Sequence, residues 1–241
     1  LRKMLELEYN RRGFKPPENA KNWSFAQLRE AILFLDPLNT DLVKRLNAAE
    51  VEFWRNSTGD RVGDSTKILG FECGGPQWVL ENCINTGTLQ NNNQADLAYM
   101  EDLLCIIEML NQPAPAPIEQ RWTARSTSPM SPAYSENADD IFSWQGVIMY
   151  IAAQRPEHQE QIREAFRKYA GRHADLTLRY GGAFHWGKID GTLWDETKIA
   201  KGLDERFDLK RFMRARQRLD PKNLLGNEKI DQLLNYTSAT A

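Results

Sequence analysis

The sequence has few residues of the kinds that form disulfides or bind metals. Only three cysteines and three histidines occur among its 241 residues. Cys73, Cys83 and Cys105 are odd in number and scattered, and no two histidines have metal-ligand spacing. We therefore expect neither a disulfide framework nor a metal site, and a reducing or at least non-secretory compartment.

Long basic runs and long apolar runs are also missing. The net charge is −2 and no long basic run occurs, so no nucleic-acid footprint is visible. The longest apolar stretches, such as residues 146–153, are too short to span a bilayer. Because the first residue is Leu and no signal or transit segment can be read, we expect a processed, truncated or partly observed chain.

Phosphate-binding loops are absent from the sequence as well. No Gly-x-Gly-x-x-Gly follows an expected strand, and no Walker-type loop occurs. The composition, 41% hydrophobic and 27% charged, is that of an ordinary globular protein.

Hydrophobic periodicity predicts a mixture of helices and strands without a regular βαβ order. Helices are expected over residues 24–35, 40–54, 91–110 and 156–178, with one or two more ending near 234. Residues 1–23 read as a connecting segment with one helical turn before it. Strands are expected over residues 67–80 (two, around a turn), 140–153 and 183–189. This order favours an α+β fold with a largely antiparallel sheet flanked by helices.

The most informative segment is charged and extended. It follows the proline-rich residues 113–117, which cannot be helical, and runs from Ile118 to Thr127. In an extended segment Glu119 and Arg121 point the same way. A carboxylate and a guanidinium on one face can present charge to a polar ligand, or can simply form a surface salt bridge within a sheet. The segment alone leaves both interpretations open.

The histidines differ in their surroundings. His158 and His173 fall on a polar helix and are expected to be solvated. His185 lies three residues before Lys188 in an expected strand, where alternation would aim the two side chains at opposite faces. A bulge or a strand end near Gly187 could bring them together, whereas one structural histidine and one surface lysine is the plainer interpretation.

These residue types suit one kind of chemistry. A desolvated lysine can act as a base, whereas Arg121 would remain a fixed positive charge. Glu, Arg, Lys and His together would suit removal of a hydroxyl proton coupled to hydride loss. No side chain accepts a hydride, so a cofactor would be required.

Several motifs together resemble one family. They are Phe25-Ala-Gln-Leu-Arg-Glu30 through Leu35-Asp-Pro-Leu-Asn39, Ala49-Glu-Val-Glu-Phe-Trp54, Arg61-Val-Gly63, Ile68-Leu-Gly-Phe-Glu-Cys-Gly-Gly75, Pro113 to Ser126, Asp140-Ile-Phe-Ser-Trp144, His185-Trp-Gly-Lys188 and Leu219-Asp-Pro-Lys-Asn-Leu-Leu225. The chain from Trp23 onward closely resembles the aldonolactone oxidoreductases of the vanillyl-alcohol oxidase flavoprotein family, in particular the mitochondrial galactonolactone dehydrogenases of plants and green algae.

The resemblance implies an FAD enzyme that oxidises L-galactono-1,4-lactone to L-ascorbate and passes the electrons to cytochrome c. It implies mitochondrial localisation, in the intermembrane space or associated with the inner membrane. It also implies an alternative role as an assembly factor bound to a membrane-arm intermediate of respiratory complex I.

The resemblance also assigns roles to residues. Glu119 and Arg121 match the acid–base pair of the active site, and Lys188 matches a lysine near the substrate hydroxyl and the flavin. The residues expected near the substrate or cofactor are His185, Cys73, Trp122 and Arg125, with Cys73 matching an oxidation-sensitive cysteine.

The family's N-terminal FAD domain has no counterpart in this sequence. We therefore expect residues 1–23 to be a linker or partial entry to the cap domain, 24–190 to be the cap (substrate) domain, and 191–241 to be a helical segment that returns to the FAD domain. Alone, such a chain should not hold FAD firmly and should not turn over.

Overall fold

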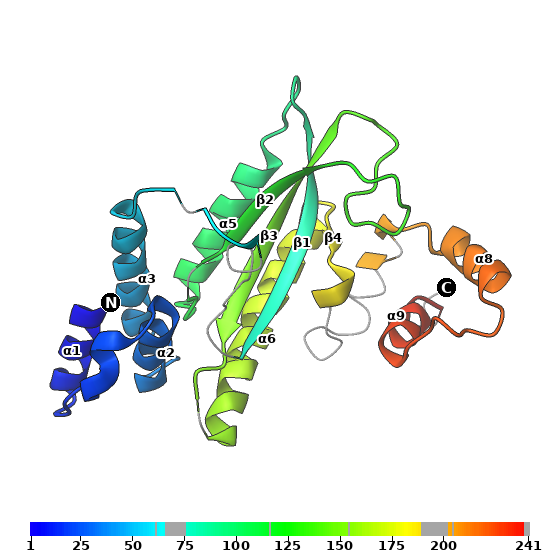
Figure 1. The fold of residues 1–241 in the computed structure, drawn as a ribbon. Helices are drawn as coiled ribbons and strands as arrows, with labels where there is room; N and C mark the ends of the chain where they lie inside the picture. The colour runs from blue at the N-terminus through cyan, green and yellow to red at the C-terminus, as the bar shows by residue number, and fades with distance from the viewer. Residues whose placement is uncertain are drawn as a thin grey trace. The chain divides into compact units, whose positions relative to one another are not determined.

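The fold is given by a computed structural model (Figure 1). The structure describes residues 1–60, 62–65, 76–115, 117–153, 155–188, 202–203 and 205–238. Its helices are α1 (Arg2–Arg11), η1 (Glu18–Asn22), α2 (Phe25–Leu35), α3 (Thr40–Arg55), α5 (Ala95–Met109), α6 (Pro156–Arg179), η2 (Trp186–Lys188), α8 (Leu209–Leu219) and α9 (Glu228–Ser238).

Local sequence signals explain where the first helices begin. At the start of α2 the Ser24 hydroxyl accepts from the Gln27 N–H, and the Gln27 side chain accepts from the Ser24 N–H. This reciprocal pair satisfies two donors that helix formation leaves free. The Asn39 side chain caps α3 with a single bond, in which Oδ1 accepts from the Leu42 N–H. Both predicted helices are confirmed, but residues 2–11, expected to be mostly a linker, form helix α1.

Four strands form one antiparallel sheet in the order β2-β3-β1-β4, as the predicted α+β class requires. The strands are β1 (Gln77–Thr88), β2 (Glu119–Ala124), β3 (Asp140–Tyr150) and β4 (Ala183–Phe184). The Ile151 N–H donates to Pro76 O, and the Thr86 hydroxyl donates to Ile141 O, so β1 and β3 run in opposite directions. From these two bonds we infer a register in which Glu81 is opposite Gly146.

Two expectations for the strands need correction. The predicted strand ending at Leu80 continues as β1 to Thr88, whereas β4 ends at Phe184 and the chain turns into η2. The turn predicted near Gly74 lies outside the described residues, as does Ile189.

Helix α5 begins at Ala95, four residues later than Asn91, because residues 91–94 hold polar side chains bonded to nearby backbone N–H groups.

One face of the sheet is joined to α5 and α6 by a buried polar network. Asn82 of β1 donates to the Tyr99 hydroxyl of α5, at 2.7 Å, and also contacts Thr177 of α6. Tyr99 in turn contacts His173 Nδ1 at 2.6 Å. His173 is therefore fully buried, not solvated as expected, and burial lowers its pKa to about 4.

The chain divides into two compact units: residues 1–78, 109–117 and 148–166 in unit 1, and residues 79–108, 118–147 and 167–241 in unit 2. The core of unit 1 is formed by α1, α2 and α3 with the end of β3, and it includes Leu5, Ile32, Leu42, Leu46 and Tyr150. A core cluster of unit 2 consists of Cys83, Ala133, Phe142 and Trp144. This division differs from the expected boundaries at residues 24 and 190, which stay a prediction.

Candidate functional site

The candidate site is built around Glu81, a residue of β1. Its side chain is only 2% exposed, yet each carboxylate oxygen has a cationic partner. Arg121 Nε lies 2.9 Å from Oε1, and Lys188 Nζ lies 2.7 Å from Oε2. Glu81 thus joins two predicted site residues that lie 40 and 107 positions away in the sequence. All of these residues belong to unit 2.

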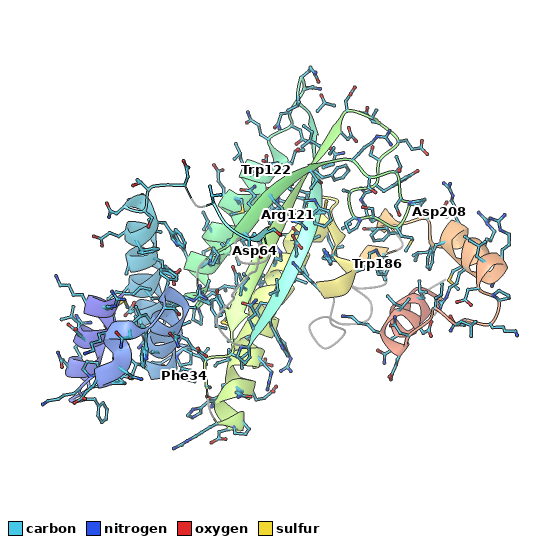
Figure 2. All side chains as sticks on the ribbon, in the orientation of Figure 1. Phe34, Asp64, Arg121, Trp122, Trp186 and Asp208 are labelled. Atoms are coloured by element: carbon cyan, nitrogen blue, oxygen red, sulfur yellow. The ribbon has the colours of Figure 1, made fainter. Side chains whose placement is uncertain are left out.

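Strand β2 supplies Arg121 (Figure 2). Arg121 is directly opposite Trp144 of β3, and its guanidinium lies 4.7 Å from the centre of the indole ring. The Trp144 Nε1–H donates to the hydroxyl of Thr123, which confirms that Arg121 and Thr123 share one face of β2. This face is opposite to the one that Asn82 presents to α5 and α6, because Glu81 and Asn82 are successive residues of a strand.

Glu119 lies on the same face as Arg121, directly opposite Gly146. A Cβ placed on Gly146 would lie 3.5 Å from Glu119 Cβ and 3.8 Å from Glu119 Oε2. The missing side chain of Gly146 therefore leaves space beside the Glu119 carboxylate. Since Glu81 is opposite Gly146 from the other side, both carboxylates flank this glycine.

The expected ion pair between Glu119 and Arg121 requires correction. Among the described residues, the carboxylate that pairs with Arg121 is Glu81. Successive same-face residues of one strand are roughly 7 Å apart, whereas Arg121 can extend over Trp144 toward β1. The guanidinium also stabilises a buried carboxylate that has few other partners more than it stabilises a partly exposed one.

The end of β4 aims Lys188 into the site. The His185 N–H donates to Glu81 O at 3.0 Å, and the Lys188 N–H then donates to His185 O at 3.0 Å. This single turn of 3₁₀-helix reverses the alternation of a strand, and so Lys188 reaches the Glu81 carboxylate. The strand-end alternative drawn from the sequence is correct, and the plainer interpretation of Lys188 as a surface lysine is not.

The electrostatics of the site favour an ionised Glu81 and a neutral His185. Burial alone raises the pKa of Glu81, but hydrogen bonds and charges from Lys188 and Arg121 outweigh it and hold that pKa below its usual value. Burial lowers the pKa of His185, and the nearby cations lower it further against the charge of Glu81. Its Nδ1 accepts from the Gly187 N–H at 3.1 Å, as a neutral imidazole can.

The other predicted site residues lie elsewhere. Trp122 points to the opposite face of β2, where its Nε1–H donates to Asp96 of α5 at 2.9 Å. Arg125 follows the end of β2, and its Nη1 donates to Ser135 O at 3.0 Å. Neither joins the cluster around Glu81. Cys73 lies outside the described residues.

Two groups of the cluster, Glu81 and Trp144, were not predicted as site residues. Glu81 was missed because the expected strand ended one residue before it. An available signal was the glutamate, followed by Asn82, inside the otherwise apolar residues 78–84, since a carboxylate in such a run must find a cationic partner. Trp144 belongs to one of the motifs on which the family resemblance rests, but the resemblance assigned no role to it.

The described part of the chain has neither a membrane-spanning helix nor a metal-ligand cluster. None of its helices is long and apolar enough to cross a bilayer. In the same residues, no three His, Cys, Asp or Glu side chains are grouped as a metal site would require.

Comparisons with known proteins show the family of the chain. Residues 15–233 match the family described as D-arabinono-1,4-lactone oxidase. Over 217 residues the chain is 47% identical to L-galactono-1,4-lactone dehydrogenase 2, mitochondrial, of Oryza sativa subsp. japonica, which covers 89% of this chain and 37% of the relative. It is 44% identical over 230 residues to L-galactono-1,4-lactone dehydrogenase, mitochondrial, of Arabidopsis thaliana, covering 92% of the chain and 37% of that relative.

The chain thus spans little more than a third of the length of the curated relatives that it matches. Within that length, the match includes β1, β2, β3 and η2, which carry the residues around Glu81. On this evidence, the chain belongs to the D-arabinono-1,4-lactone oxidase family.

Proposed function

We propose that this chain forms the substrate-binding part of an FAD-dependent aldonolactone dehydrogenase that oxidises L-galactono-1,4-lactone to L-ascorbate. The observation that carries the proposal is the convergence of Arg121 and Lys188 on Glu81, beside Glu119. The names of the relatives support the choice of lactone. Polar, oppositely charged groups on one sheet face suit a small polyhydroxylated substrate.

The geometry suggests a role for each residue. Arg121 is always ionised and acts as a fixed positive charge toward the lactone oxygens. Lys188 is held against Glu81 and acts as a polarising cation rather than as a base. Glu119 borders the space above Gly146 and accepts the hydroxyl proton, while neutral His185 orients the turn that carries Lys188. Lactone oxidation then releases one proton to Glu119 and one hydride.

The residues around Glu81 fit contact with the ring end of FAD. Arg121 and Lys188 are 47% and 32% exposed and offer N–H donors on one sheet face, which suits a ring that becomes electron-rich on reduction. When bound, FAD supplies the acceptor for the hydride. The sequence offers no glycine-rich phosphate loop, so we assign the dinucleotide part of FAD to residues outside this chain.

The relatives are named mitochondrial, and we propose the same compartment for the protein that contains this chain. Localisation at the inner membrane or in the intermembrane space, and cytochrome c as electron acceptor, remain predictions from the resemblance. The alternative role in complex I assembly is also a prediction from the resemblance. Copurification with membrane-arm subunits tests it.

The proposed function is tested on the full-length enzyme under anaerobic conditions. L-Galactono-1,4-lactone should bleach the flavin absorbance in a single turnover, and cytochrome c should restore it. The variant E119Q should slow bleaching, because an amide cannot accept the proton. No bleaching by this lactone, or bleaching by D-arabinono-1,4-lactone alone, would disprove the proposed substrate.

A further inference from the structure

Glu81 organises three site groups at once. Its two carboxylate oxygens hold Arg121 Nε and Lys188 Nζ, and its backbone oxygen accepts from the His185 N–H. The Glu81 side chain is buried, and the two cationic side chains extend outward from it. The exposed fractions of Arg121 and Lys188 are more than tenfold higher than that of Glu81. Glu81 itself is thus shielded from a ligand that could touch Arg121 and Lys188.

The contacts with Glu81 leave most donors of both cations available. Arginine carries five N–H groups and lysine three. Among the described residues, Glu81 uses the Nε–H of Arg121, and Trp144 supports the guanidinium from one side. Among the described residues, the Nη groups of Arg121 and the other N–H groups of Lys188 have no further hydrogen-bond partner.

We propose that Glu81 is a positioning residue of the lactone site, whose buried carboxylate fixes the directions of Arg121 and Lys188 so that their remaining N–H groups converge on one substrate. The proposal rests on the proposed function and deepens it. Glu81 does not touch the substrate. Its contribution is the geometry of two cations whose charges alone would drive them apart.

Charge compensation alone is the competing explanation for Glu81, and a control carboxylate separates the two. Glu8 of α1 is also buried and contacts Arg11, Arg12 and Arg45, but it belongs to unit 1. The variants E81Q and E8Q each replace a buried carboxylate by an amide of the same shape. We expect both to lower the melting temperature of the full-length holoenzyme.

The kinetics of the two variants should differ. E81Q should slow lactone-dependent flavin reduction by about 100-fold, a loss that a misplacement of about 1 Å can cause, while E8Q stays within about twofold of wild type. Lactone should also raise the melting temperature of wild type and E8Q but not of E81Q, a readout of binding that needs no turnover. Equal kinetics and equal lactone-induced shifts for E81Q and E8Q would show that Glu81 only stabilises the fold.

A double-mutant cycle tests whether Glu81 acts through its partner. In a K188M background, E81Q should cost less than about tenfold, because one of the two groups that it positions is already gone. A cost near 100-fold in that background would contradict the proposal.

A second variant covers the case in which E81Q does not fold. E81D keeps the charge but shortens the side chain by one methylene, so it cannot reach both cations as Glu81 does. We expect a loss of about tenfold, and wild-type kinetics for E81D would refute a positioning role. These ratios can be measured with whichever lactone reduces the flavin, so failure of the proposed substrate and failure of this inference are distinguishable.

Discussion

Glu8 and Glu81 are two buried carboxylates that nearby cations keep ionised, but the cations come from different parts of the chain. Glu8 is 3% exposed and Glu81 is 2% exposed, and both gather cations. Burial alone raises the pKa of each, and hydrogen-bonded cations hold the pKa of each below its usual value. By burial and by the direction of their pKa shifts the two residues are alike.

Their difference lies in where the cations come from. Arg11 and Arg12 follow Glu8 by three and four positions on the same helix, and Arg45 comes from α3. The partners of Glu81 come from another strand and from a turn more than a hundred residues later. Cations spaced along one helix stabilise that helix, whereas cations brought together from distant segments on an open sheet face define a site.

Removing Arg121 should have the largest effect. R121A leaves Glu81 with one cation and removes the charge that we assign to the lactone. We expect kcat/KM for the lactone to fall by about two to three decades, with losses in both kcat and apparent affinity. Steady-state kinetics of the full-length enzyme measure this, and near wild-type values would remove Arg121 from the mechanism.

Removing the charge of Lys188 should have a smaller effect. K188M keeps the apolar stem and leaves Arg121 paired with Glu81. Flavin reduction by lactone in stopped-flow should slow by about one to two decades, while re-oxidation by cytochrome c should be unchanged. If both half-reactions slowed equally, Lys188 would instead affect the flavin environment as a whole.

Replacing Glu8 should change stability without changing rate. E8Q leaves three partly exposed arginines close together, and we expect a loss of about 2 kcal/mol, reduced from the cost of a fully buried pair by solvent screening. Because the folded pKa of Glu8 is lowered, its contribution exists above the unfolded value of about 4.5 and disappears as pH falls through the folded value. Denaturation at pH 7 and at pH 3 should therefore show a larger difference between wild type and E8Q at the higher pH.

Glu50 sharpens the comparison because it is a buried carboxylate whose Oε1 has no hydrogen-bond partner among the described residues. Burial raises its pKa to about 7, against the opposing charge of Arg29. The folded state therefore holds the proton more tightly, and stability falls as pH rises from about 4.5 to about 7. E50Q should raise the free energy of unfolding by about 1 kcal/mol at pH 8 and by nothing at pH 4. A destabilised E50Q at pH 8 would indicate a partner that the ionised carboxylate requires.

The sequence predicts the amphipathic helices of this fold well, because a cap and a single apolar stripe specify each of them. Helices α2 and α3 begin at the predicted residues, after Ser24 and Asn39. Strand β1 was the harder element. Its second half contains Asn82, Asn85 and Thr86, and no alternation of apolar and polar residues marks a strand whose polar groups are buried in hydrogen bonds.

The same feature limited the prediction of the site. Glu119, Arg121 and Lys188 were identified from motifs and side-chain chemistry, and the structure places them in one unit. The residue that connects two of them was not identified, because its partners are set by tertiary pairing of β1, β2 and η2. His173 was misassigned for a related reason, since a polar helix can still bury one histidine against Tyr99.

Strand β1 presents Glu81 to the site and the next residue, Asn82, to the helices. A strand has a period of two, so inserting or deleting one residue between Pro76 and Glu81 would exchange these two faces. A deletion would place the Asn82 amide between Arg121 and Lys188. An insertion would instead place the Glu81 carboxylate against Tyr99 and Thr177. Homologues that retain this site should therefore differ in β1 by substitution and not by length, so a gap in this stretch of an alignment indicates a misaligned or inactive sequence.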